Sequence, residues 1–237
     1  MLPLVSIPEV VQHYSSHFSS LFSEAEYTHF QKYLSGLIVS ENKTIEGINR
    51  LFVLELKDQS TLNRFLTDSS YEVRALNQKR LELMNADART QLKGQGHYGG
   101  VLGLDDTLLI HYGKHFEGIA YLKDHVTNQY VWAHNLVNLH YSDDVVDYPI
   151  DFELWRPMDT QHLAQTLQTV GVKIKPSKVK LKDSHPKKWK RHLTYLQKKH
   201  ASKPEVAAAY RSKIAIGQDL LRNFYQQYPL DIPIAFD

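Results

Sequence analysis

The sequence contains no cysteine among its 237 residues. This excludes a disulfide-stabilised scaffold, an iron–sulfur cluster and a zinc site with cysteine ligands. It has no apolar run near the roughly 18 residues that a membrane-spanning helix needs. Its first residues also lack the basic lead and the apolar length of a signal peptide. We therefore expect a soluble, cytoplasmic protein with no membrane partner.

The sequence also has no strong excess of basic over acidic residues, or of acidic over basic ones. The formal net charge is +2 with histidine neutral, so the total charge does not identify a partner. The glycine-rich run at residues 94–100 lacks the Lys-Ser/Thr ending of a phosphate-binding P-loop, and we interpret it as a linker. It separates a helical region, residues 1–93, from a strand-containing region, residues 101–237.

Residues 1–93 carry helix signals. Ser23 and Glu26 have the spacing of a capping box, and apolar residues at helical period follow them. Thr44 and Ser60 are candidate N-caps of two further helices, and residues 71–92 predict a longer one. This region is either a packing support or a surface that contacts DNA. Its candidate phosphate contacts are Lys43, Arg50 and Arg64.

Strand patterns begin after the linker. Residues 101–104 form a short apolar run that ends at Asp105 and Asp106, which predicts a buried strand with carboxylates at its end. Residues 130–141 and 150–154 predict strands joined by a turn as an antiparallel meander. We also expect a short strand at 118–122, helices at 160–170 and 204–228, and a last strand at 232–237.

The first and last predicted strands of residues 101–237 suggest a site for divalent metal ions. Helices before the last strand are typical of a crossover to a parallel neighbour. If the first and last strands are neighbours, the carboxylates of Asp106 and Asp237 meet as hard oxygen ligands for Mg²⁺ or Mn²⁺. Such ions can activate a water molecule or a 3′-hydroxyl. However, an aspartate that follows a strand is more often a turn former or a helix N-cap.

Several segments between Phe22 and Asp237 carry a more specific signal. They are Phe30–Leu37, Asn42–Arg50, Leu62–Leu66, Ser69–Tyr71, Leu104–Thr107, His111–Lys114, Gly118–Tyr121, Asp124–His125, Tyr130–Asn135, Leu139–Tyr141 and Pro233–Asp237. Together they resemble bacterial insertion-sequence transposases of the DDE type. The resemblance implies an α/β (α+β) fold, in which an N-terminal helical region precedes an incomplete ribonuclease-H-like mixed sheet with flanking helices.

The resemblance also implies an activity and its residues. Asp106 corresponds to the first catalytic carboxylate and Asp237 to the second, both as metal ligands, with Asp105 and Lys114 in possible supporting roles. The expected reaction is metal-dependent cleavage of transposon ends followed by strand transfer. The third carboxylate, a glutamate on a later helix, has no counterpart here. We therefore expect a truncated, catalytically incomplete copy.

A basic segment lies between the carboxylate-bearing strands. Residues 173–203 hold twelve Lys or Arg and one acidic residue, Asp183. The segment is either a solvated lysine-rich insertion or a contact with DNA phosphates. The candidate contacts are Lys187, Lys188, Lys190 and Arg191. Trp189, Leu193 and Leu196 recur on one face and indicate a folded helix.

The expected partner is double-stranded DNA, at transposon ends and target, with a homodimer in the DNA complex and a nucleoid location. Two other functions stay open: a non-catalytic DNA-binding or inhibitory fragment, and a host ribonuclease-H-like nuclease. A dedicated zinc site is not expected: His111 and His115 are four residues apart, but Gly113 between them argues against a helix that holds both on one face. We expect His134 and His140 to satisfy hydrogen bonds in the sheet.

Overall fold

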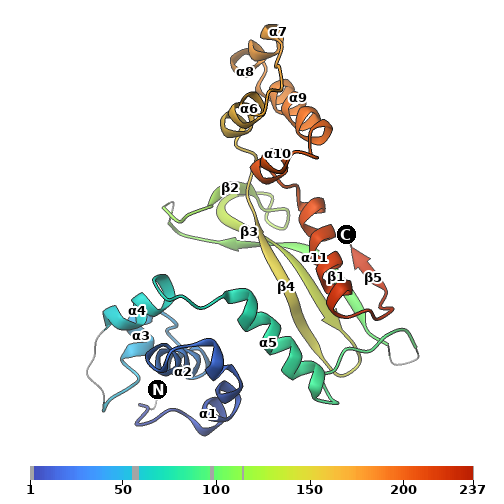
Figure 1. Cartoon of the computed structure of the whole chain (residues 1–237). Helices are drawn as coiled ribbons and strands as arrows, with labels where there is room; N and C mark the ends of the chain where they lie inside the picture. Colours follow the sequence, from blue (N-terminus) through green and yellow to red (C-terminus); the bar gives the residue numbers. More distant parts are fainter. Residues whose placement is uncertain (1–2, 55–58, 97–98, 114, 237) are drawn as a thin grey trace. The chain divides into compact units, whose positions relative to one another are not determined.

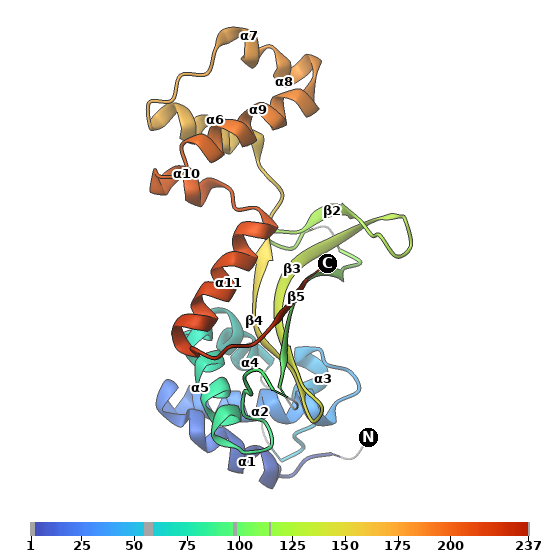
Figure 2. The ribbon, with the colours of Figure 1, turned by 90° about the vertical axis from the view of Figure 1, so that its right-hand side faces the viewer.

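The computed structural model describes residues 3–54, 59–96, 99–113 and 115–236. The chain divides into two compact units, Met1–Gln91 and Leu92–Asp237 (Figures 1 and 2). The first is helical and the second holds a mixed five-stranded sheet with helices, so the predicted α/β class is confirmed. In the described part of the chain, no helix has the length and apolar character needed to cross a membrane.

The first unit contains short helices around a small apolar core. The elements are α1 (Glu9–Ser15), η1 (Ser16–Leu21), α2 (Glu24–Val39), α3 (Ile45–Asn49), α4 (Gln59–Thr67) and α5 (Val73–Ala86). The predicted capping box begins α2, since the Ser23 amide donates to Glu26 Oε2 at 2.9 Å and the Glu26 amide to Ser23 Oγ at 3.4 Å. Ile48, Leu62 and Phe65 form the buried centre.

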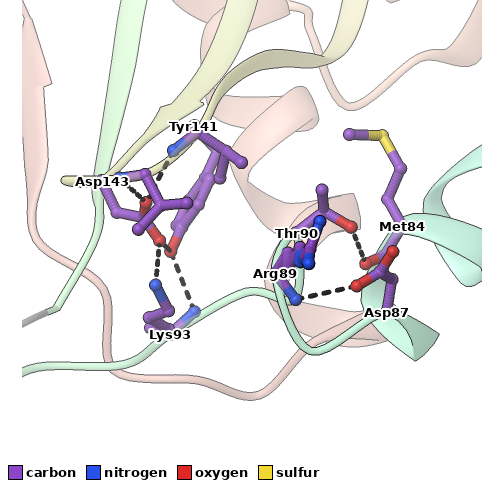
Figure 3. A network of polar contacts seen from close by, with 9 residues as sticks. Met84, Asp87, Arg89, Thr90, Lys93, Tyr141 and Asp143 are labelled. Atoms are coloured by element: carbon purple, nitrogen blue, oxygen red, sulfur yellow. Dashed lines mark hydrogen bonds and ion pairs between the residues drawn. The ribbon is translucent and has the colours of Figure 1, made fainter.

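Two helix limits in this unit differ from the prediction. Ser60 lies inside α4 and is not its N-cap, because the helix already begins at Gln59. Helix α5 ends at Ala86, well before Leu92. Figure 3 shows the local reason: Asp87 Oδ1 accepts the Arg89 amide at 2.9 Å, and Thr90 Oγ1 donates to the Met84 carbonyl at 2.6 Å. These side chains offer the backbone an alternative to the next helical turn.

The second unit is built on one sheet. Its strands are β1 (Val101–Ile110), β2 (Ala120–Lys123), β3 (Tyr130–Ser142), β4 (Asp147–Trp155) and β5 (Ile234–Phe236). The strand order is β2-β3-β1-β5, and β4 also pairs with β3. The predicted meander is confirmed, as β3 is antiparallel to β4, and β5 runs parallel to β1 as the crossover indicated.

Strand β1 is longer than predicted, and this moves both aspartates. Asp105 and Asp106 were expected at the end of a strand, but they lie in the middle of one. The reason is β3, which pairs with β1 without a break from Val101↔Ser142 to Ile110↔Ala133. The β-favouring residues after Asp106 therefore find partners and extend the ladder.

Six helices connect β4 to β5. Helices α6 (Thr160–Thr169), α7 (Pro176–Val179), α8 (Leu181–Ser184), α9 (Pro186–Lys199) and α10 (Pro204–Ala209) form what we call the helical insertion, and α11 (Lys213–Gln227) returns along the sheet (Figures 1 and 2). Gly171, at φ 82°, follows α6 as predicted. The single helix expected at 204–228 is two, because the backbone is extended at Tyr210 and Ser212 caps α11.

The helical insertion has a hydrophobic core of its own. Trp189, Leu193 and Leu196 from α9 pack with Leu163 and Leu167 from α6. Helix α9 is therefore folded and amphipathic, as its apolar period indicated.

A polar cluster connects the segment before β1 to the turn between β3 and β4 through hydrogen bonds and an ion pair (Figure 3). Tyr141 is fully buried; its hydroxyl accepts the Lys93 amide at 3.0 Å and donates to Asp143 Oδ2 at 2.9 Å. The Lys93 ammonium lies 2.8 Å from the same oxygen. Burial and the neighbouring carboxylate raise the pKa of Tyr141 to about 12.

Candidate active site

Asp106 lies at the centre of a polar site on the sheet. Its Oδ2 accepts a hydrogen bond from Asn135 Nδ2 on β3 at 2.7 Å. The same oxygen lies 2.7 Å from the ammonium of Lys213, the first residue of α11. Asn135 is buried at 2% exposure, whereas the side chain of Asp106 is 39% exposed. The carboxylate is therefore held from within the sheet and is open to solvent on its other side.

The packing of α11 on β1 explains why Lys213 reaches Asp106. Gly217 on α11 lies against the Leu104 side chain of β1: a Cβ at this position would come within 2.7 Å of Leu104 Cδ2, so the leucine side chain would have to shift. Lys213 precedes Gly217 by four residues, about 6 Å along a helix. Asp106 follows Leu104 by two residues, about 6.6 Å along a strand and on the same face. The two spacings match, so the Gly217–Leu104 contact brings Lys213 over Asp106.

The surroundings keep Asp106 ionised. Partial burial alone would raise the pKa of this carboxyl. The hydrogen bonds from Asn135 and Lys213, together with the lysine charge, outweigh that effect and hold the pKa of Asp106 below its ordinary value. Asp106 is thus a carboxylate, with charge-assisted contacts to one of its two oxygens.

Trp155 forms the wall of the site on β4. The Lys213 ammonium lies 5.1 Å from the centre of its ring, within the range of a cation–π contact. Trp155 stands opposite Asn135 in the β3–β4 register. Asn135 Oδ1 and Trp155 Nε1 are both buried, and neither has a hydrogen-bond partner among the residues described. Two buried polar atoms of residues that contact Asp106 or Lys213 thus lack a hydrogen-bond partner among the described residues.

Ion pairs fix the start of α11 to β4. Arg211 pairs with Glu153 on β4 and, at 2.7 Å, with Asp219 on α11. Asp219 also pairs with Arg222. These contacts pair Arg211 with carboxylates other than Asp106, whereas Lys213, two residues later, pairs with Asp106 itself.

The structure brings together only part of the predicted catalytic set. Asp105 points away from Asp106, because successive strand residues face opposite sides of a sheet, and it accepts the Asp106 amide at 2.7 Å. Lys114 and Asp237 lie outside the described residues. The described part of β5 ends at Phe236, which pairs with Leu104 on β1.

The described residues fit a divalent cation in chemistry, though not as a complete centre. In the ranges that the structure describes, no three His, Asp or Glu side chains converge as a metal site. Mg²⁺ needs only one or two protein carboxylates, since phosphate and water supply its other ligands. Asp106 provides one ionised hard donor that is open to solvent, and Asn135 Oδ1, an oxygen without a hydrogen-bond partner among the described residues, is buried behind it.

The predicted DNA contacts in the first unit make short-range interactions. Lys43 donates to the Leu37 carbonyl, Arg50 pairs with Glu46 one turn away, and Arg64 donates to Ser60 Oγ at 3.3 Å. All three are exposed.

The predicted contacts in the helical insertion lie on α9. All four are exposed, whereas Trp189 between them is buried; they are Lys187, Lys188, Lys190 and Arg191. Among the described residues, no carboxylate forms an ion pair with any of the four. Their charges are thus available to an anionic partner.

Histidine contacts agree with a structural role. His134 is hydrogen-bonded, as expected, but to the loop after β1: its Nδ1 lies 2.9 Å from His111 Nε2, and its Nε2 lies 2.7 Å from the Glu117 carbonyl oxygen. His140 pairs with Asp147 across the β3–β4 ladder at 2.8 Å.

Three residues of the site were not predicted from the sequence: Asn135, Trp155 and Lys213. Lys213 carried a usable signal, because it directly follows the N-cap Ser212. Cations are disfavoured at that end of a helix, so a lysine there suggests a nearby anion.

Comparison with known proteins gives one family. A family model described as DDE superfamily endonuclease matches residues 17–230, which is most of the chain. No curated protein and no solved structure matches significantly. The matched range includes Asp106, Asn135 and Lys213 and ends before β5.

Proposed function

The chain belongs to the DDE superfamily endonuclease family, and from this premise we propose that it is a DNA transposase. In the proposed reaction, a water oxygen attacks the phosphorus at a transposon end and the P–O3′ bond breaks. The freed 3′-hydroxyl then attacks a phosphorus in target DNA and displaces the target's own 3′-oxygen. The observation that carries this proposal is the ionised, solvent-open carboxylate of Asp106, fixed by Asn135 and Lys213.

We assign the metal-binding role to Asp106 and Asp237, with Mg²⁺ or Mn²⁺ as the cofactor. When bound, the ion supplies charge to the reacting phosphate and lowers the pKa of a bound water molecule or 3′-hydroxyl. Asn135 keeps the Asp106 carboxylate in one orientation from a buried position in β3. Lys114 remains a proposed contact for phosphate, and Asp105, which faces the other side of the sheet, a supporting carboxylate that does not bind the ion.

Binding of double-stranded DNA is assigned to two surfaces. One is the basic side of α9, Lys187, Lys188, Lys190 and Arg191, whose charges have no carboxylate partner among the described residues. The other is Lys43, Arg50 and Arg64 in the first unit. Contacts with phosphates position DNA without reading its sequence. We further propose a homodimer in the DNA complex, because two ends must be joined, and a location on the nucleoid.

The test compares Asp106→Asn with Asp105→Asn in the full chain. The two residues are adjacent, so each substitution removes one carboxylate charge from the same strand, but only Asp106 contacts Asn135 and Lys213. We expect D106N to lower Mg²⁺-dependent nicking of end-containing DNA by at least about 100-fold while DNA binding stays within about twofold. D105N retains most of the nicking. Equal loss of nicking and binding in D106N would contradict the assigned role.

A second function, DNA binding without cleavage, is favoured by the unpaired charges of α9 alone. Binding of end-containing DNA in a gel shift, with no nicking by the wild-type chain at any Mg²⁺ or Mn²⁺ concentration, selects this function over transposition.

A further inference from the structure

The contact between Lys213 and Asp106 places a cation where the proposed function requires a metal ion. The ammonium lies 2.7 Å from Asp106 Oδ2, and the two side chains are 36% and 39% exposed. Both are therefore accessible, and neither is locked in a dry interior. A divalent ion that binds Asp106 Oδ2 would have to replace this ammonium.

The position of Lys213 is not explained by its helix. It is the first residue of α11, where the unpaired backbone N–H groups already give the helix a positive end. A lysine is disfavoured there unless an anion compensates for it. Asp106 supplies that anion, and the Trp155 ring supports the ammonium from the side at 5.1 Å. The ammonium of Lys213 is thus held between the Asp106 carboxylate and the Trp155 ring.

We propose that Lys213 is the resident counter-ion of Asp106 in the metal-free protein and that it competes with the divalent cation for this carboxylate. The inference rests on the proposed function, because it takes Asp106 as a metal ligand. In the metal-free state the ammonium and Asn135 Nδ2 both contact Asp106 Oδ2 at 2.7 Å. Metal binding displaces the ammonium from Asp106, so the lysine lowers the affinity of the site for the ion.

The geometry limits how strongly Lys213 competes. An ion pair between partly exposed groups is weak, because water screens it and two flexible side chains must be ordered. Removing the competitor is therefore expected to tighten metal binding by about two- to fivefold and no more. A role confined to holding α11 on the sheet predicts a different result: lower thermal stability and unchanged metal affinity.

The experiment titrates the full chain with Mn²⁺ in the absence of DNA and measures free Mn²⁺ by electron paramagnetic resonance. Lys213→Met removes the charge but keeps an apolar side chain against Trp155, and Lys213→Gln is a second neutral variant. Lys213→Arg is the matched control that keeps the charge. We expect K213M and K213Q to bind Mn²⁺ about two- to fivefold more tightly than the wild type. K213R is expected to bind Mn²⁺ no more tightly than the wild type.

Asp106→Asn in the same titration separates the two proposals. If D106N loses Mn²⁺ binding while K213M and K213Q bind as the wild type does or more weakly, the competition is refuted and the metal site stands. If D106N binds Mn²⁺ as well as the wild type, Asp106 is not a ligand and the assignment in the proposed function fails. Thermal melts of each variant establish that the proteins compared are folded.

Discussion

Tyr141→Phe tests whether the polar cluster at the entry to β1 stabilises the second unit. The substitution keeps the buried ring but removes a hydroxyl that accepts from Lys93 and donates to Asp143. One lost bond involves a charged acceptor and the other a backbone amide. We expect unfolding free energy to fall by about 2–3 kcal/mol. For a unit of this size, this corresponds to about 4–10 °C in Tm.

The pH dependence gives a sharper form of the same prediction. The pKa of Tyr141 is raised to about 12 in the folded chain, from about 10 in an unfolded one. The folded state therefore holds this proton more tightly. Its stabilising contribution is complete below pH 10 and is lost as the pH rises toward 12. At pH 11 about 1.4 kcal/mol should already be lost, so the wild type and Y141F should differ less at pH 11 than at pH 8.

Urea unfolding followed by tryptophan fluorescence measures this difference. Trp132, Trp155 and Trp189 are the three tryptophans of the chain, and all belong to the second unit. Other tyrosines titrate in both proteins and cancel in the comparison. A gap between the wild type and Y141F that stays the same from pH 8 to pH 11 would refute the reasoning, as would a Y141F protein as stable as the wild type.

The remaining predictions concern Asp143 and α9. Burial disfavours the Asp143 carboxylate, but Lys93, the Val145 and Val146 amides and Tyr141 together hold its pKa far below the ordinary value. The contribution of this carboxylate to the free energy of unfolding is thus present above about pH 4 and is lost as the pH falls further. Asp143→Asn should lower the free energy of unfolding by about 3 kcal/mol at pH 7. In urea unfolding at a series of pH values, the variant should also lose less stability than the wild type between about pH 4 and lower pH. Alanine at Lys187, Lys188, Lys190 and Arg191 together should reduce the slope of log K against log salt for DNA by up to about 3.6, at about 0.9 per phosphate contact, and leave Tm unchanged. An unchanged slope would show that these four residues of α9 do not contact DNA phosphates.

Elements with strong local signals could be predicted from the sequence. The Ser23–Glu26 capping box, the glycine that ends α6 and the apolar period of α9 each depend on neighbours a few residues away. The end of β1 could not be predicted in this way. Its length is set by pairing with β3, whose Val137 stands opposite Asp106 far along the chain. Asp105 and Asp106 suggest the end of a strand by their composition, but pairing with β3 continues the strand beyond them.

In the candidate site, too, one residue could be predicted from its neighbours in sequence and others could not. Asp106 was found from the residues around it, and its resemblance to a known motif added a role. Lys213 is 107 residues away from Asp106, and no local spacing connects them. Their contact follows from the close approach of Gly217 to Leu104, a packing event that only the folded chain reveals. Asn135 lies in a segment that carries the family resemblance, Tyr130–Asn135, but its orientation toward Asp106 depends on strand register.

The separate core of the helical insertion has an evolutionary consequence. Because Trp189 and its neighbours are buried against one another and not against the sheet, substitutions on the outside of α9 alter one module without disturbing the strand that carries Asp106. The exposed basic residues of α9 can therefore vary between related proteins without a change in the position of Asp106. An insertion in the connection between α6 and α7 should be tolerated where a single inserted residue in α11 is not.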